Sequence, residues 1–98
     1  MLILVTLRRE PLHGYAIAQR IHQTSDDLLR VEEGSLYPAL QRILIEGWAS
    51  AEWGTSAHNR RVRIYTLTAA GRKQLSKETK RVGRLIDGIA RVIRPLGA

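Results

Sequence analysis

The chain opens with a run of apolar residues and continues with an amphipathic pattern, and together these predict two helices. Residues 2–7 are apolar on nearly every side, as in a short buried helix, and Pro11 cannot continue that helix. Residues 15–23 carry apolar side chains at helical spacing and polar ones on the opposite face. The apolar positions are Tyr15, Ile17, Ala18 and Ile21. We therefore expect two helices joined by a turn over residues 11–14.

A third helix is predicted between Ser35, its expected N-cap, and Gly47, which suits the left-handed position beyond a helix C-terminus. With this start Pro38 is the third helical residue, where a missing N–H leaves no hydrogen bond unmade. The polar residues 24–27 separate this helix from the second one, and residues 28–31 favour a brief strand before it. The apolar stripe of the helix consists of Leu36, Leu40, Ile43 and Leu44.

Two segments rich in β-branched and aromatic residues follow, and they predict a hairpin with a long polar tip. The strands are expected at residues 48–53 and 61–67. Either face of the second strand could be buried, and we expect the face of Tyr65 and Leu67 to join the core. The competing face carries Val62 and Ile64.

The longest periodic pattern predicts a helix from Ala69 to about Arg94, with Thr68 as its N-cap and Pro95 and Gly97 at its end. Roughly 25 residues would span about 38 Å, more than a domain of this size can cover, so the far half should pack on a second copy. The spacing of its apolar seam is that of a coiled coil and comprises Leu75, Thr79, Val82, Ile86, Ile89, Ile93 and Leu96. Dimerisation is expected through the last five, Val82, Ile86, Ile89, Ile93 and Leu96.

Three helices followed by a hairpin form the arrangement of a winged helix-turn-helix domain. The expected fold is mostly α with a small β-hairpin. Residues 1–67 form the winged helix-turn-helix region and residues 68–98 the long C-terminal dimerisation helix, within one continuous domain. In this arrangement the third helix enters the major groove of DNA. The candidate contacts on it are Ser35, Tyr37, Pro38, Gln41 and Arg42. The alternative is that these residues are only the polar face of an amphipathic helix.

The charge of the chain favours a polyanionic partner. Lys and Arg number 16 against 9 Asp and Glu, a net charge of +7, and the isoelectric point is near 10.8. Positive charge is concentrated at the hairpin, where it can contact a phosphate backbone or the minor groove. The residues concerned are His58, Asn59, Arg60, Arg61 and Arg63. A basic surface without a partner, or a solvated hairpin edge, is the alternative.

Other classes of function find little support. The absence of cysteine excludes disulfides, thiolate zinc sites and cysteine nucleophiles, and it fits a cytoplasmic protein. The first apolar run is too short to cross a bilayer, so no membrane association is expected. His13, His22 and His58 lie in three different elements, and no catalytic pair, phosphate-binding glycine loop or metal-ligand spacing is visible. We expect no enzymatic activity, no catalytic or metal-binding residue and no cofactor.

Several short motifs form a signature. They are Leu12-His13-Gly14-Tyr15 with Ile17-Ala18, Gly34-Ser35-Leu36-Tyr37-Pro38-Ala39-Leu40 with Arg42, Gly47-Trp48, and Tyr65-Thr66-Leu67-Thr68 with Gly71 and Leu75. On these residues nearly the whole chain resembles the PadR family of transcriptional regulators. Two departures are a start close to the first helix and the lack of the longer C-terminal domain of some members.

The resemblance implies a homodimer, assembled mainly through the last helix and often the first, that binds a two-fold symmetric operator and usually represses transcription. It places Ser35, Tyr37, Pro38 and Gln41 at the DNA and the hairpin tip on the backbone. A dimer would set two recognition helices about 34 Å apart, which predicts an inverted repeat with that spacing. Phenolic acids or drugs release some members, so a small-molecule effector stays open here.

The main rival interpretation is a winged-helix module that binds RNA or a protein. RNA-binding modules usually display aromatic side chains for stacking on bases, whereas this chain has no Phe and its hairpin tip has no aromatic residue. Trp48 and Trp53 could line an apolar pocket near a dimer interface, but packing in the core is the favoured interpretation. Duplex DNA is therefore the expected partner.

Overall fold

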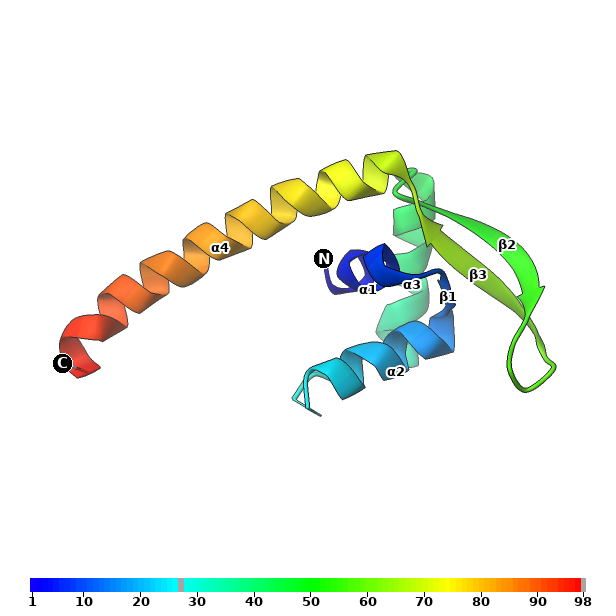
Figure 1. Ribbon diagram of the computed structural model, residues 1–98, viewed down its shortest axis with the longest axis horizontal. Helices are drawn as coiled ribbons and strands as arrows, with labels where there is room; N and C mark the ends of the chain where they lie inside the picture. Colours follow the sequence, from blue (N-terminus) through cyan, green and yellow to red (C-terminus); the bar gives the residue numbers. More distant parts are fainter. Residues whose placement is uncertain (27, 98) are drawn as a thin grey trace.

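Within residues 1–26 and 28–97, which this computed structural model describes, the chain forms four helices and a three-stranded antiparallel sheet (Figure 1). The side chains of residues 33 and 95–97 lie outside that description. The strands lie in the order β1-β3-β2. The winged helix-turn-helix fold with a long last helix is confirmed. In chain order the elements are α1 (Leu2–Arg9), β1 (Leu12–His13), α2 (Gly14–Thr24), α3 (Glu33–Ile45), β2 (Ala49–Thr55), β3 (Arg61–Leu67) and α4 (Ala69–Gly97).

One apolar core joins α1, α2 and α3 to the base of the sheet. Its most deeply buried side chains, each at most 1% exposed, come from all three helices and are Leu4, Ile17, Leu36 and Leu40. Tyr65 and Leu67 of β3 are buried as expected, whereas Val62 and Ile64 on the other face are only half-buried. The core therefore fixes the base of the β2–β3 hairpin relative to α3.

The end of α3, the base of the hairpin and the start of α4 meet at one junction. Gly47 has a φ of 76°, and the N–H groups of Gly47 and Trp48 donate to carbonyls in the last turns of α3, which ends the helix as predicted. The Thr68 hydroxyl donates to the Gly47 carbonyl at 2.6 Å and accepts the Gly71 N–H at 3.0 Å. Thr68 is thus the predicted N-cap of α4, and it also ties that helix to the end of α3.

The sheet differs from the expectation in two places. Residues 11–14 were predicted to form only a turn, but Leu12 and His13 form β1, which pairs with β3. Residues 28–31 form no strand, contrary to the prediction. The physical reason is that β3 has two edges, one of which pairs with β2 and the other with β1. β1 takes the edge of β3 beside Ile64 and Tyr65, and residues 28–31 pair with none of the three strands.

The start of α3 was also predicted wrongly. The helix begins at Glu33, because the N–H groups of Ser35 and Leu36 both donate to the carbonyl of Glu32. Ser35 is therefore inside the helix rather than its N-cap. Pro38 lies well inside the helix and not in its first turn. Lacking an N–H, it cannot donate to the carbonyl four residues before it, at Gly34.

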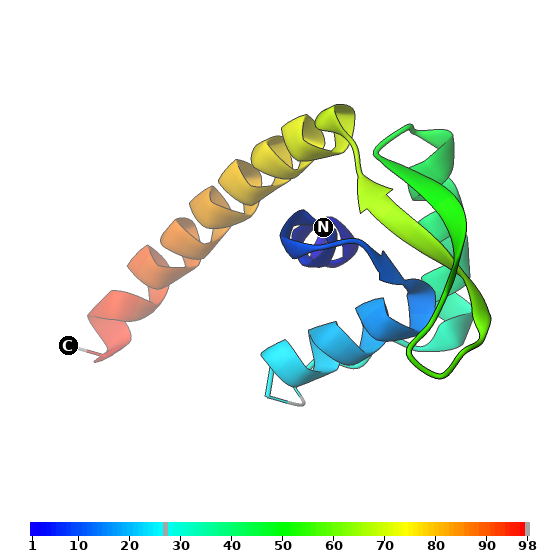
Figure 2. The same ribbon diagram turned by 45° about the vertical axis from the view of Figure 1, so that its right-hand side comes forward.

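The far half of α4 leads away from the rest of the molecule (Figures 1 and 2). The helix runs to Gly97, past the predicted end near Arg94. Its start is anchored by Leu75, which is 2% exposed, but all described side chains over residues 84–94 are exposed. The accessible surface of 7442 Å² exceeds the about 5,700 Å² of a compact chain of this mass. The structure therefore leaves this half of α4 without a packing partner in its own chain.

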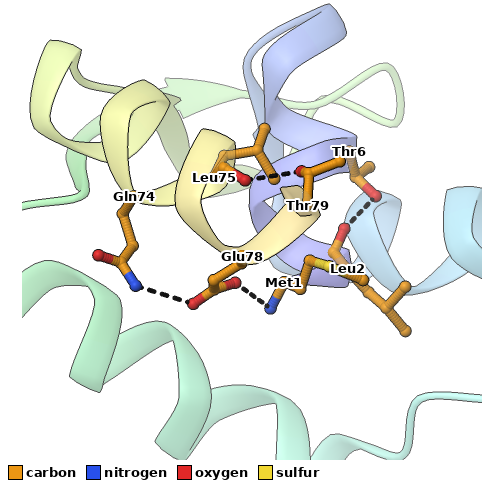
Figure 3. Close-up of polar contacts among 7 residues, drawn as sticks. All are labelled: Met1, Leu2, Thr6, Gln74, Leu75, Glu78 and Thr79. Atoms are coloured by element: carbon orange, nitrogen blue, oxygen red, sulfur yellow. Dashed lines mark hydrogen bonds and ion pairs between the residues drawn. The ribbon is translucent and has the colours of Figure 1, made fainter. Parts of the chain in front are cut away.

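A small polar cluster joins α1 to the anchored part of α4 (Figure 3). The Met1 ammonium lies 3.4 Å from Oε2 of Glu78, and the Gln74 amide donates to Oε1 of Glu78 at 3.1 Å. Burial of the carboxyl raises the pKa of Glu78, but the hydrogen bond from Gln74 and the charges of the Met1 ammonium and Arg81 outweigh it. Together they hold the pKa of Glu78 below its ordinary value. The ionised form of Glu78 therefore stabilises the contact between α1 and α4.

Replacing Gly71 with Ala should destabilise the fold. A Cβ there would overlap the carbonyl oxygen of Trp48 and crowd the side chain of Leu67, and such overpacking costs about 2 to 3 kcal/mol. Gly83→Ala is the matched control in the same helix, because nothing lies within 4 Å of its added Cβ. Thermal unfolding should show Gly71→Ala unfolding at a lower temperature, whereas Gly83→Ala gains about 0.5–1 kcal/mol from helix propensity. Equal shifts of the unfolding temperature in the two variants would contradict the close contact assigned to Gly71.

The free energy of unfolding should depend on the protonation of Glu78. Because its pKa is lower in the folded than in the unfolded chain, its contribution is present above the unfolded pKa and is lost as the pH falls through the folded pKa. Glu78→Gln should therefore lower the free energy of unfolding near pH 7, by less than about 1 kcal/mol. Denaturant titrations of the 98-residue chain should show this difference shrinking below about pH 4. A difference that is constant from pH 7 to pH 3 would contradict the assigned role.

Candidate nucleic-acid interface

The β2–β3 hairpin projects from the core as a wing (Figure 2). Its antiparallel pairs run from Ala49 opposite Leu67 to Thr55 opposite Arg61. At the tip, the N–H of Ser56 donates to the Arg60 carbonyl at 2.8 Å. Directly opposed residues project from the same face of a sheet, so the buried face at the base of the wing continues outwards as a single inner face.

The first turn of α2 lies beside this inner face because β1 pairs with β3. His13 is the last residue of β1 and also the N-cap of α2, because its Nδ1 accepts the N–H of Ala16 at 3.3 Å. The next residue, Gly14, is buried, and a Cβ added to it would lie 3.4 Å from the Leu40 side chain and 3.5 Å from the Tyr37 side chain of α3. This close approach brings Tyr15, which is 60% exposed, to the space between α3 and the wing.

A cleft of about 960 Å³ separates α3 and the start of α2 from the wing. Basic, aromatic and hydroxyl or amide side chains line it, and none of the described Asp or Glu side chains does. The lining residues are His13, Gly14, Tyr15, Tyr37, Gln41, Trp53, Ser56, His58, Arg60, Arg61, Val62, Arg63 and Tyr65. The cleft can therefore offer many hydrogen-bond donors to an anion without repelling it.

The five residues predicted on the recognition helix are all exposed on α3 but fall into two groups. Tyr37 and Gln41 border the cleft, facing the wing. Ser35, Pro38 and Arg42 are exposed outside the cleft lining. The first pair can thus act together with the wing, whereas the other three can only act from the open surface of the helix.

Four of the five predicted wing residues also border the cleft: His58, Arg60, Arg61 and Arg63. Asn59 lies at the exposed tip outside the lining, and its φ of 59° shows that it makes the left-handed turn there. This position is explained by the turn of the hairpin as well as by a contact with a ligand. The wing is therefore basic along its inner face as well as at its tip.

The two tryptophans lie in different environments, and the prediction that both pack in the core was wrong for Trp53. Trp48 is half-buried and packs against the core, whereas Trp53 is 60% exposed in the cleft. The Arg61 guanidinium carbon lies 4.5 Å from the centroid of the Trp53 ring, and that of Arg63 lies 5.9 Å away. Pairing Trp53 with Arg63 across the hairpin would have revealed this cluster, but the sequence alone did not fix the register.

Sequence reasoning also missed His13 and Tyr15 as residues of the site. Both belong to the motif that carries the family resemblance, but their place beside the wing depends on the pairing of β1 with β3, which was not predicted. Among the described residues, no group of three His, Cys, Asp or Glu side chains could hold a metal ion. None of the helices in the described part of the chain is long and apolar enough to cross a membrane.

Solved structures similar to this chain include one bound to DNA. A protein from Streptococcus mutans has a TM-score of 0.78 and 31% identity, covering 92% of this chain and 83% of that one. Bacillus subtilis PadR, solved in complex with operator DNA, has a TM-score of 0.69 and 25% identity, covering 79% of this chain and 44% of that one.

Sequence comparison identifies the family. A 37.1 kDa protein in a transposon of Streptomyces fradiae is 39% identical over 85 residues, which is 87% of this chain. The match takes up 23% of the Streptomyces protein, so the chain spans about a quarter of that relative. The PadR-like family of transcriptional regulators matches residues 3–77. Because that match covers more than three quarters of the sequence, the chain belongs to the PadR-like family of transcriptional regulators.

Proposed function

We propose that the chain binds duplex DNA sequence-specifically and represses transcription from a two-fold symmetric operator. The observation that carries the proposal is the cleft, because the exposed face of α3 and the basic inner face of the wing border the same space, with no acidic side chain among the described lining residues. An α-helix fits the major groove, and a neighbouring basic hairpin can follow the phosphate backbone. The DNA complex of Bacillus subtilis PadR supports this choice of partner.

We assign separate tasks to α3 and to the wing. On α3, the Gln41 amide has the donor and acceptor geometry that pairs with adenine, and Arg42 can offer two donors to guanine. On the wing, Arg60, Arg61 and Arg63 neutralise phosphates, which adds affinity without reading sequence. Specificity would thus come mainly from the helix and salt-dependent affinity mainly from the wing.

We also propose that the regulator acts as a homodimer joined through α4. The apolar side chains on one stripe of the far half are 49–73% exposed, an unfavourable state for a soluble protein. They are Leu85, Ile86, Ile89, Val92 and Ile93. Val82, also predicted at the interface, is half-buried in the protomer. Leu96, the last predicted contact, has a side chain outside the described residues.

Fluorescence anisotropy with duplex DNA from upstream of the chain's own gene tests the DNA proposal. Purified protein should prefer this duplex over a random one, bind it with two chains per site, and lose affinity steeply as salt rises. Gln41→Ala should reduce the preference for the native duplex about tenfold, because it removes a base contact. Gln23→Ala is the control, since this exposed glutamine of α2 does not line the cleft.

The same titration separates the alternative partners. Equal and weak binding to native and random duplex would contradict an operator-binding regulator. Tyr15, Tyr37 and Trp53 are exposed and aromatic at the cleft, so tighter binding to single-stranded RNA than to either duplex would indicate an RNA-binding module instead.

The dimer proposal predicts that Ile89→Lys separates the subunits. A lysine there would bury a charge in the apolar stripe, and dimerisation should weaken at least tenfold. Asp87→Lys introduces the same side chain two residues away, on the opposite face of α4, and should leave the dimer intact. Sedimentation equilibrium over a range of concentrations measures both. If Ile89→Lys dimerises as strongly as the unmodified chain, α4 is not the interface.

A further inference from the structure

Trp53 occupies an unusual place for a large aromatic side chain. It stands on β2 in the middle of the wing, is 60% exposed, and faces the cleft rather than the core. The ring is not part of the core at the base of the hairpin, where the buried residues are Ala49, Tyr65 and Leu67. The exposed area of Trp53 therefore calls for a partner within the cleft or a ligand that enters it.

The register of the wing provides two partners. Trp53 lies directly opposite Arg63, and Arg61 is two residues further along the same face of β3. The guanidinium carbons of Arg61 and Arg63 lie 4.5 and 5.9 Å from the centroid of the ring. Both distances fall within the range of a favourable cation–π contact. One indole ring thus serves two arginines.

This arrangement restrains the arginines without using up their donors. A guanidinium stacked on a ring keeps its N–H groups free at its edge, so it can still bind an anion in two places. In the described part of the chain, the ion pairs involve neither Arg61 nor Arg63. Because the ring already limits their side-chain rotamers, less conformational entropy is lost when they bind.

The far wall of the cleft suits the same ligand. Tyr15 from α2 and Tyr37 from α3 border the same space across from the arginines, and both supply hydroxyl donors. Donors on both walls, with no carboxylate among the described lining side chains, favour a ligand that carries negative charge. A DNA strand carries phosphodiesters at regular intervals, and its backbone borders the groove that α3 would enter.

We propose that Trp53 is a positioning residue for DNA binding, whose ring holds Arg61 and Arg63 so that both reach phosphodiesters of one strand lying between the wing and α3. The inference rests on the proposed function and assigns the cleft to the backbone of the same duplex. It also predicts a signature: phosphodiesters carry no sequence information, so losing Trp53 should weaken binding to native and random duplexes by the same factor.

Trp53→Leu and Trp53→Tyr provide the test, because leucine keeps an apolar side chain and tyrosine keeps an aromatic face. Trp53→Leu should weaken binding to both duplexes about threefold to tenfold, and Trp53→Tyr should restore most of the loss. Thermal unfolding should change little in either variant, since the ring is largely exposed. Tight binding by Trp53→Leu, or no recovery in Trp53→Tyr, would overturn the inference.

A double-mutant cycle distinguishes positioning from a general effect on the wing. Arg61→Ala should cost less affinity in the Trp53→Leu background than in the unmodified chain, because the ring no longer directs the guanidinium. Arg60 also lines the cleft, but no ring contact joins it to Trp53. Arg60→Ala should therefore cost the same in both backgrounds. Additive behaviour of Trp53 and Arg61 would overturn the positioning role.

A spectroscopic measurement covers the case in which Trp53→Leu does not fold. In Trp48→Phe, Trp53 is the only tryptophan left, and its quenching by acrylamide should fall when duplex DNA is added. Unchanged quenching in the saturated complex would overturn the inference. Failure of the proposed function is distinguishable, because it would show as equal affinity of the unmodified chain for native and random duplex, whatever the effect of Trp53→Leu.

Discussion

The arrangement of the whole molecule depends on the contact between the backbone at Trp48 and the first turn of α4. Gly71 lies so close to the Trp48 carbonyl that no side chain fits between them, and Thr68 joins the end of α3 to the start of α4 through two hydrogen bonds. The wing leaves from this junction and returns to it. The third helix, the wing and the proposed dimer helix therefore meet at one small set of contacts, which adds to the core that α3 shares with the sheet.

The junction connects two ends of the molecule that differ in surface chemistry. The wing lies at one end of the molecule and the far half of α4 at the other (Figure 1). The wing and α3 border a basic cleft, whereas the far half of α4 exposes an apolar stripe. A rigid connection between the two matters for a symmetric regulator, because pairing of α4 with a second copy would also set the separation of two recognition helices. In the proposed dimer, the geometry of the protein interface thus determines which operator spacing can be bound.

Features governed by local backbone chemistry could be predicted from the sequence. Gly47 ends α3 in the left-handed conformation and Thr68 caps α4, since both effects depend on neighbouring residues alone. The long amphipathic pattern of α4 likewise showed an apolar stripe that one chain cannot cover. Among the site residues, the basic wing and the exposed face of α3 were found because charge and helical periodicity are visible in the sequence.

Features that depend on pairing between distant segments could not be predicted. The two-residue strand β1 carries no periodic signal, and it forms because β3 offers it an edge. The placement of His13 and Tyr15 at the cleft follows from that pairing. Trp53 is a large aromatic residue of the kind that usually packs in a core. Only the register of β2 with β3 reveals that it faces two arginines.

In the proposed dimer, two copies of this chain are joined through α4 and present two clefts to one duplex. Hydroxyl-radical footprinting on DNA from upstream of its own gene tests that claim most directly. A dimer joined through α4 should protect two regions related by two-fold symmetry, with centres about 34 Å apart, one turn of the duplex. Protection of a single half-site, or of two sites without symmetry, would contradict it.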